Sequence, residues 1–394
     1  MEDFRKILDV ATGVRTPFFV YDASTMRDKH RLLREGLNPQ FEIFYALKSN
    51  PNIRVAQIMS QLGLGADVAS SGELELAEIA GFLSEKISFA GPGKTEDELK
   101  IAIEKNLSFI SIESIQELLL VHSIAQQLNK IACVGVRVNP ARPLKSSGMI
   151  MGGESTQFGI DEEQLADFFR ALKHLSHVQF KGLHVFAGSQ ILNHTVLLDS
   201  FENVMRIALM IKDSYGAKLD IINFGGGFGI PYFKNEKVLD IHAFSAGLKD
   251  LLSKYNFFGM FPGTRFFVEA GRYLVGESGY YVTKILYKKV SRGKTFLITD
   301  GGMNHHLAAT GNLGQILQKN YHIKILNKID EPCDEKVSIA GPLCTPLDIL
   351  ANNIMLPHAS PGDLVCICNS GAYGYSASPL KFLSHHEPPE VVIE

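Results

Sequence analysis

Short apolar segments and amphipathic stretches alternate along the first two thirds of the chain. The segments between the apolar ones, such as 71–80, mix leucine, isoleucine and alanine with glutamate at helical spacing. The strand-like segments cover residues 41–48, 65–70, 87–91, 109–114, 133–139, 180–188, 221–227 and 265–271. Eight strands alternating with helices predict an α/β fold, namely a (β/α)8 TIM-type barrel. A doubly wound open sheet fits the same periodicity.

The pattern changes after residue 278. Short strand-like segments separated by Gly, Pro and Asp turns cover residues 280–287, 295–299, 322–325, 336–340, 363–368 and 390–393. They predict a C-terminal all-β domain, which the strand-like residues 16–21 are expected to join. The predicted organisation is therefore a barrel over 25–278 and a β-sheet domain made of 1–24 with 279–394.

Composition and charge narrow the functional classes. The chain has 394 residues, 45% of them hydrophobic, and a net charge of -3 without a basic stripe, so nucleic acid is not an expected partner. No apolar run approaches a membrane span, and the first residues do not resemble a secretory signal. The five cysteines are odd in number and dispersed. These features predict a cytoplasmic protein without disulfides or a metal site.

Lys48 ends the first barrel segment, in Phe-Tyr-Ala-Leu-Lys48, and the turn formers Ser-Asn-Pro follow it. The carboxyl ends of barrel strands carry the active site in this fold. An amine held there in an apolar wall can be shifted toward its neutral form and attack a carbonyl. A strand-end lysine that reaches solvent is the simpler interpretation of this segment taken alone.

Two further segments carry candidate phosphate chemistry. Gly225-Gly-Gly-Phe-Gly229 follows a predicted strand, and glycines let backbone N–H groups approach a phosphate closely, although a tight structural turn has the same composition. Glu269 and Arg272 end the eighth segment as Glu-Ala-Gly-Arg. They could hold the ring nitrogen and the phosphate of one cofactor, or form an ion pair with each other.

The β-sheet domain contributes two more candidates. Cys344 lies in the turn-rich segment Gly-Pro-Leu-Cys-Thr-Pro-Leu-Asp, where a thiol can donate a proton to a carbanion. Tyr373 lies in Gly-Ala-Tyr-Gly and could offer its hydroxyl to a phosphate. A packed thiol and a core tyrosine are the structural alternatives.

Six short motifs, in their order along the chain, resemble those of a known protein family. It is the family of fold-type III decarboxylases that depend on pyridoxal 5'-phosphate (PLP), which includes ornithine and diaminopimelate decarboxylases. The motifs span nearly the whole chain, and each alone has low specificity. They are Tyr-Ala-Leu-Lys48-Ser-Asn, Gly-Ala-Asp67-Val-Ala-Ser, His184-Val-Phe-Ala-Gly-Ser189-Gln, Gly225-Gly-Gly227, Glu269-Ala-Gly-Arg272 and Cys344 followed by Gly-Ala-Tyr373-Gly.

The resemblance implies a role for each matched residue. Lys48 would form the internal aldimine with PLP, Glu269 would bond the pyridine nitrogen, and the Cys344 thiol would protonate Cα after loss of CO2. Phosphate contacts would come from Ser189, Gly227, Arg272 and Tyr373. Further cofactor contacts would come from Asp67, His184, Phe186, Gly226 and Gly271. The family's active site lies between the subunits of a homodimer, so Cys344 would reach the PLP of the partner subunit.

The substrate contacts implied are Arg137, Thr345 and Asp348. Thr345 stands where diaminopimelate decarboxylases have an acidic residue, and Phe186 stands where the family has a histidine stacked on the cofactor, with His184 beside it. Other segments resemble a branch that acts on conjugated substrates, either amino acids bound to carrier proteins or siderophore precursors such as a citrylated diamino acid. These segments start at residues 149, 344 and 378. A small-molecule amino-acid derivative or a carrier-bound amino acid is therefore the predicted substrate.

Several alternatives stay open from the sequence. Simple ornithine, lysine, arginine or diaminopimelate decarboxylation needs an acid near the distal amine, which Asp348 could supply. An amino-acid racemase would favour arginine in place of Glu269, and a non-catalytic PLP-binding regulator would tend to lose Lys48. The polar segment 140–156 is expected to overhang the active-site mouth as a mobile loop. Candidate contacts for the distal end of the substrate are Arg142, Lys145, His305 and His306, with surface solvation as the alternative.

Overall fold

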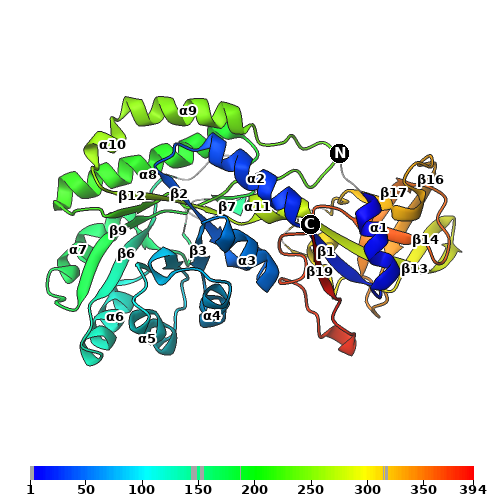
Figure 1. Ribbon diagram of the computed structural model, residues 1–394, viewed down its shortest axis with the longest axis horizontal. Coiled ribbons are helices and arrows are strands. Elements are labelled where there is room, and N and C mark those ends of the chain that lie inside the picture. Colours follow the sequence, from blue (N-terminus) through cyan, green and yellow to red (C-terminus); the bar gives the residue numbers. More distant parts are fainter. Residues whose placement is uncertain (1–3, 143–148, 151–154, 187, 314, 316–317) are drawn as a thin grey trace. The chain divides into compact units, whose positions relative to one another are not determined.

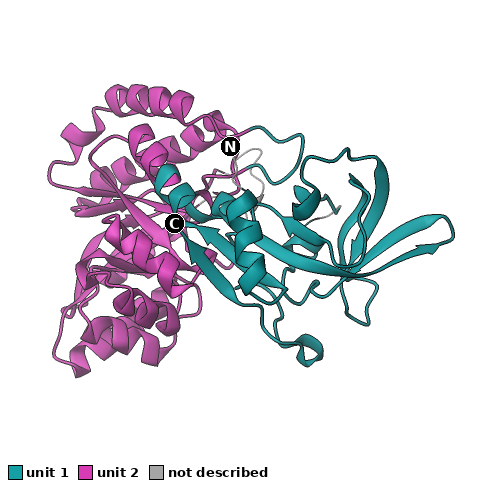
Figure 2. Cartoon of the chain, turned by 45° about the vertical axis from the view of Figure 1, so that its right-hand side comes forward, with its two compact units in different colours: residues 1–28, 231–237, 274–394 teal, residues 29–230, 238–273 magenta. Residues whose placement is uncertain are grey.

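The computed structural model describes residues 4–142, 149–150, 155–186, 188–313, 315 and 318–394. It divides into two compact units (Figure 2). Unit 1 comprises residues 1–28, 231–237 and 274–394, and unit 2 comprises residues 29–230 and 238–273. The predicted segment 140–156 falls largely on residues 143–148 and 151–154, which lie outside the described residues.

Unit 2 is a closed parallel barrel, which confirms the predicted (β/α)8 fold and excludes the open sheet. Among the described residues, eight strands pair in one circuit, because β5 pairs with β6 as well as β4, and β2 pairs with β12. The circuit consists of β2 (Phe41–Ala46), β3 (Gly65–Val68), β4 (Ile87–Phe89), β5 (Phe109–Ile112), β6 (Ala132–Asn139), β9 (Val178–His184), β11 (Ile221–Asn223) and β12 (Arg265–Ala270). All eight predicted barrel strands are present, with ends that differ by a few residues.

Helices surround these strands (Figure 1). The helices are α2 (Ala23–Gly36), α3 (Ile53–Gln61), α4 (Ser71–Ile79), α5 (Glu96–Glu104), α6 (Ile115–Gln127), α7 (Leu165–Leu172), α8 (His194–Tyr215), α9 (Ile241–Lys254), α10 (Phe257–Met260) and α11 (Arg272–Val275). Serine, threonine and asparagine caps fix several helix starts directly after strands. Ser70 and Ser114, for example, each accept the backbone N–H three residues later. No helix in the described ranges has the length and apolar character needed to cross a bilayer.

Aromatic rings fill the barrel interior. Phe44 and Phe267 stack with their ring centroids 4.1 Å apart, and Phe109 belongs to the same buried cluster. Glycines face these rings: a Cβ on Gly135 would lie 1.9 Å from Phe109, and one on Gly65 would lie 2.6 Å from Phe44. The interior is therefore a packed core, and polar chemistry is confined to the strand ends above it.

Unit 1 is built on a mixed β-sheet, as the changed sequence pattern predicted. Its main strand path runs β15–β18–β13–β14–β16–β17, and β1 joins it by pairing with β13 and β19. The strands are β1 (Phe18–Asp22), β13 (Gly279–Ser291), β14 (Lys294–Thr299), β15 (Ile323–Ile325), β16 (Glu335–Ala340), β17 (Ile349–Leu356), β18 (Leu364–Ile367) and β19 (Glu390–Ile393). The N-terminal strand thus joins the C-terminal sheet, as expected. Strand β17 was not predicted.

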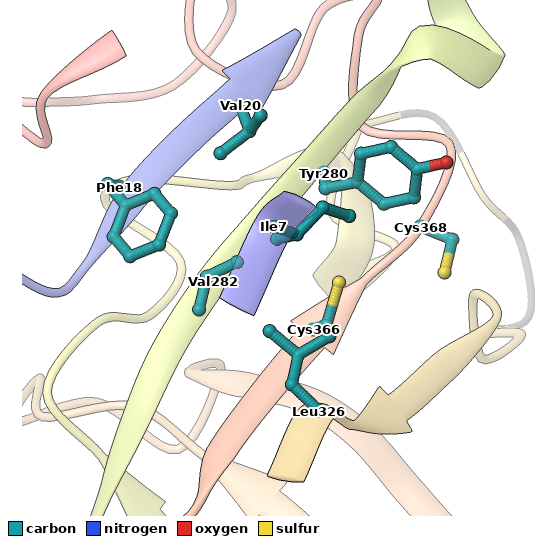
Figure 3. Close-up of a cluster of buried hydrophobic side chains, with 8 residues drawn as sticks. All are labelled: Ile7, Phe18, Val20, Tyr280, Val282, Leu326, Cys366 and Cys368. Atoms are coloured by element: carbon teal, nitrogen blue, oxygen red, sulfur yellow. The ribbon is translucent and has the colours of Figure 1, made fainter. Parts of the chain in front are cut away.

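Helix α1 (Phe4–Gly13) lies over this sheet. Its Ile7 packs against side chains of β1, β13 and β18 in one buried cluster (Figure 3). Cys366 and Cys368 belong to that cluster, and Ile367 between them is buried as well. All five cysteines lie in the described ranges, and none of them forms a disulfide.

Candidate active site

One polar side chain lies at or just beyond the carboxyl end of each barrel strand. They are Lys48, Asp67, Ser88, Ser111, Arg137, His184, Asn223 and Glu269, in the order of their strands. All except Lys48 are buried. Strand pairing sets several of them at one level, since Arg137 is opposite His184 and His184 is opposite Asn223. The barrel therefore carries a ring of polar groups where α/β barrels build active sites.

Lys48 lies in a 3₁₀ turn, Leu47–Ser49, directly after β2. Its Nζ lies 3.3 Å from Oδ2 of Asp67 and 5.7 Å from the ring centroid of Phe186. The side chain is 41% exposed. The amine thus lies just beyond the end of its strand, as expected. The expectation that apolar side chains alone enclose it is wrong, because the carboxylate of Asp67 lies beside it.

Asp67 is the buried partner of that amine. Its Oδ1 accepts a hydrogen bond from the Ser88 hydroxyl at 3.2 Å. Burial raises the pKa of Asp67 to about 6, the nearby charge of Glu269 adds to the rise, and Lys48 opposes it. Asp67 is therefore a carboxyl group that titrates near neutral pH within 3.3 Å of Lys48.

His184 links two other members of the ring. Its Nδ1 lies 2.8 Å from the Ser111 hydroxyl, and its Nε2 lies 3.3 Å from Oε1 of Glu269. Burial lowers the pKa of His184 to about 3, and the charge of Arg137 contributes. The imidazole is therefore neutral near pH 7 and adds no charge beside the Glu269 carboxylate, and its buried Nε2 has no hydrogen-bond partner among the described residues.

Asn223 connects Glu269 to the glycine turn. Its Nδ2 donates to Oε1 of Glu269 at 2.7 Å, and its Oδ1 accepts the N–H of Gly225 at 2.9 Å. Gly225 and Gly227 have φ values of 64° and 109°, which disfavour residues with a Cβ. A Cβ on Gly226 would also lie 2.4 Å from the Glu269 carbonyl oxygen. The turn therefore requires glycine, and its bare backbone can approach a phosphate.

Arg137 is held by a second buried carboxylate. Its guanidinium donates to Oε1 of Glu113 at 2.9 Å and lies 4.8 Å from the ring of Phe158 and 6.0 Å from that of Phe186. Glu113 also accepts backbone N–H groups of Gly91 and Gly159. Phe186 thus lies near both Arg137 and Lys48, and it also lines the glycine turn.

Three other predicted cofactor contacts belong to the same unit. Ser189 lies in β10 (Gly188–Ser189), which pairs with β7 (Met149–Ile150), and Arg272 begins α11. Gly271 lies close to the Lys48 turn, because a Cβ there would be 2.9 Å from Ser49. The contact of Ser189 and Arg272 with phosphate, and of Gly271 with the cofactor, stays a prediction.

The remaining predicted residues belong to unit 1. Cys344 is exposed, and Thr345 follows it in a loop between β16 and β17. Asp348 is 2% exposed and accepts two backbone N–H groups of its own unit. Tyr373 lies in a turn with a φ of 59°.

Sequence reasoning missed some site residues and misjudged others. Ser88, Ser111 and Asn223 were not predicted, and their signal is a single polar residue inside an apolar strand. His305 and His306 were candidate contacts for the distal end of the substrate, with surface solvation as the alternative, but they are 1% and 0% exposed, which rules out solvation. The distal-substrate candidate Lys145 lies outside the described residues.

The described residues fit PLP. A glycine turn offers backbone to a phosphate, a buried carboxylate can accept from a protonated ring nitrogen, and an accessible amine can bind an aldehyde. These groups occur together in one barrel mouth, whereas the residues described contain no cluster of His, Cys, Asp and Glu able to hold a metal ion. Fold and site thus define an α/β-barrel enzyme equipped for a phosphorylated carbonyl cofactor.

The chain belongs to the pyridoxal-dependent decarboxylase family. Residues 23–276 match the family described as the pyridoxal binding domain of pyridoxal-dependent decarboxylases. It is 41% identical over 393 residues to the L-glutamyl-(BtrI acyl-carrier protein) decarboxylase of Niallia circulans, covering 99% of this chain and 91% of that one. It is 32% identical to the diaminopimelate decarboxylase of Methanothermobacter thermautotrophicus, covering 98% and 88%.

Solved structures agree with this assignment. The diaminopimelate decarboxylase of M. jannaschii superimposes with a TM-score of 0.89 at 28% identity, covering 98% of this chain and 89% of the other. That of Helicobacter pylori, in complex with L-lysine, has a TM-score of 0.88 at 28% identity, covering 98% and 94%. The protein is therefore a PLP-dependent amino-acid decarboxylase, a carboxy-lyase.

Proposed function

We propose that the enzyme removes the α-carboxylate of an amino acid whose distal end is conjugated, with a glutamyl group attached to an acyl-carrier protein as the first candidate. One observation carries this proposal: the full-length identity of 41% to a decarboxylase with that named substrate exceeds the 32% to diaminopimelate decarboxylases. Cytoplasmic localisation remains an expectation from the sequence.

Thr345 supports the same substrate class. Diaminopimelate carries a second charged amino-acid group, which an acidic residue after the cysteine would help to hold. Thr345 offers no negative charge there, and its Oγ1 already accepts the N–H of Leu347 at 3.3 Å. A conjugated distal end, which lacks that ammonium group, suits a neutral side chain better.

The barrel residues would divide the work of holding the cofactor. PLP, when bound, supplies an electron sink for the bond that loses CO2. Lys48 would bind its aldehyde carbon, Glu269 would hold a proton on the ring nitrogen, and Gly225–Gly227 would receive its phosphate. Arg137, fixed by Glu113, would pair with a substrate carboxylate at the rim.

The Cys344 thiol would hold the proton that is delivered to Cα. We propose a homodimer in which Cys344 of one subunit serves the Lys48 of the other. Mixing the Lys48→Ala and Cys344→Ala variants tests this arrangement. Exchange of subunits should restore up to about a quarter of the activity by random pairing, because one site of the mixed dimer is intact. Continued inactivity of a verified mixed dimer would contradict shared sites.

A substrate panel tests the function itself. The panel contains glutamyl carrier protein, an N-acylated ornithine, a citrylated diamino acid, and free glutamate, ornithine, lysine and diaminopimelate, each with PLP and measurement of released CO2. We expect release from at least one conjugated substrate, and none in the Lys48→Ala control. Release from free amino acids alone would refute the conjugated substrate. Loss of substrate chirality without CO2 would favour a racemase.

Diaminopimelate decarboxylation is the second candidate, because several relatives and structural neighbours carry that name. The Thr345→Glu variant separates the two candidates. It should raise activity toward diaminopimelate and lower it toward the conjugated substrate. A wild-type enzyme that already prefers diaminopimelate would establish the second candidate instead. A regulator without turnover is disfavoured because the named relatives are decarboxylases.

A further inference from the structure

Asp348 follows Cys344 by four residues, and each of its two carboxylate oxygens accepts a backbone N–H within unit 1. Oδ1 accepts the backbone N–H of Met303 at 2.6 Å, and Oδ2 accepts that of Leu343 at 2.8 Å. The residue is 2% exposed, although it lies at the end of a turn-rich loop. A carboxylate that recognises a substrate amine needs an oxygen that the amine can reach, and this geometry does not provide one.

Two glycines close the space around this carboxylate. A Cβ on Gly302 would lie 2.4 Å from Oδ1, and a Cβ on Gly341 would lie 2.4 Å from Oδ2. Any other residue at either position would push the carboxylate out of place. The two loops therefore approach Asp348 from both sides with backbone alone.

The contacts of Asp348 bracket Cys344 along the chain. The bond to Leu343 fixes the residue before the cysteine, and the N–H of Asp348 donates to the carbonyl of the residue after it, Thr345, at 3.3 Å. The bond to Met303 ties the same loop to the segment after β14. Cys344 itself is exposed, so its position depends on these flanking bonds.

We propose that Asp348 is a positioning residue that fixes the loop presenting Cys344, and not a ligand of the substrate. The inference rests on the proposed role of Cys344 as proton donor. It also explains how an exposed thiol can be presented in one orientation, since the buried carboxylate holds the N–H of the residue before it and the backbone N–H of Asp348 holds the carbonyl of the residue after it. The substrate specificity of this loop then falls to partly exposed neighbours such as Thr345.

The test compares Asp348→Asn with Asp363→Asn in the holoenzyme. Asp363 is a matched control, because it is also buried in unit 1 and accepts a backbone N–H, that of Ser360. We expect Asp348→Asn to lower kcat about tenfold or more with KM changed less than about twofold. Hydrogen exchange at Met303 and Leu343 should accelerate by about tenfold or more, and not in the control.

A large rise in KM with unchanged exchange at Met303 and Leu343 would overturn the proposal and make Asp348 a substrate ligand. If Asp348→Asn does not fold, Gly302→Ala provides a second test, because the three atoms nearest its Cβ all belong to the Asp348 carboxyl group, so it displaces the carboxylate without removing the charge. It should accelerate exchange and lower kcat in the same way, and wild-type behaviour would overturn the proposal. If neither variant folds, the wild-type amides of Met303 and Leu343 decide, since exchange as fast as in exposed loops would overturn it.

A failure of the proposed role of Cys344 can be told apart from a failure of the role proposed for Asp348. Normal turnover and product in Cys344→Ala would remove the proton-donor role. Exchange at Met303 and Leu343 would still report whether Asp348 holds the loop.

Discussion

Replacing Asn223 tests whether one amide side chain couples the Glu269 carboxylate to the glycine turn that begins at Gly225. Asn223→Ala removes a hydrogen bond to the Glu269 carboxylate and one to the N–H of Gly225, both buried. A hydrogen bond to a charged group contributes about 1.5–3 kcal/mol and a neutral one about 0.5–1.5 kcal/mol. The free energy of unfolding should therefore fall by about 2–4 kcal/mol.

Asn223→Ala should weaken PLP binding as well as lower the free energy of unfolding. We expect the dissociation constant for PLP, measured by titrating apoprotein and following cofactor absorbance, to rise by about tenfold or more, because 1.4 kcal/mol is a factor of ten. Asn223→Asp keeps an acceptor for Gly225 but places a second carboxylate beside Glu269, so its PLP affinity should fall further as pH rises.

Asn139→Ala is the matched control. Its Nδ2 donates to Oδ1 of Asp161 at 2.7 Å, the same length as the bond from Asn223 to Glu269. It should lose stability while retaining PLP affinity. Wild-type PLP affinity in Asn223→Ala, or an equal loss in the control, would refute the coupling.

Four other predictions each concern a single residue. Lys48→Ala should abolish both the visible absorbance of the lysine-bound cofactor and CO2 release, whereas Cys344→Ala should keep PLP bound and slow turnover or divert protonation. The folded pKa of Asp67, about 6, exceeds its ordinary 3.8, so wild-type stability should fall as pH rises through that window. The free energy of unfolding of Asp67→Asn, measured with urea, should therefore rise relative to that of the wild type by up to about 3 kcal/mol over the same pH window. The pKa of His184 is lowered to about 3, so the folded protein keeps this imidazole neutral where the unfolded chain protonates it. The free energy of unfolding should therefore fall by about 1.4 kcal/mol per pH unit as pH falls below about 6.5. His184→Gln should remove that slope, and an unchanged pH profile in either variant would contradict the assigned shift.

The barrel was predictable because its strands are mostly apolar and alternate regularly with amphipathic helices. Strand β17 was missed, since Asn352 and Asn353 interrupt its apolar residues. Asn353 has a φ of 52°, and the pairing of β16 with β17 shifts register nearby. A bulge of this kind places polar residues inside a strand, so alternation alone does not reveal it.

The burial of polar side chains was harder to predict from the sequence than the barrel strands. His306 lies in a sequence rich in turn residues, yet its Nε2 lies 2.9 Å from the Ser370 hydroxyl, and burial lowers its pKa to about 3. That partner is 64 residues away. Likewise, the carboxylate beside Lys48 comes from the next strand, so the sequence of the lysine segment alone suggested an apolar wall. Local pattern identifies such residues but not the partners that bury or charge them.

A competition assay measures directly whether the enzyme prefers a conjugated substrate to diaminopimelate. Glutamyl carrier protein and free diaminopimelate, labelled with different carboxyl isotopes, are supplied together to the wild-type holoenzyme, and the isotope ratio of the released CO2 gives the ratio of kcat/KM values. The proposed function predicts a preference for the carrier-bound glutamyl group of about a hundredfold or more, because a site that cannot pair the distal charged group of diaminopimelate rejects that substrate. Equal release, or a preference for diaminopimelate, would contradict it.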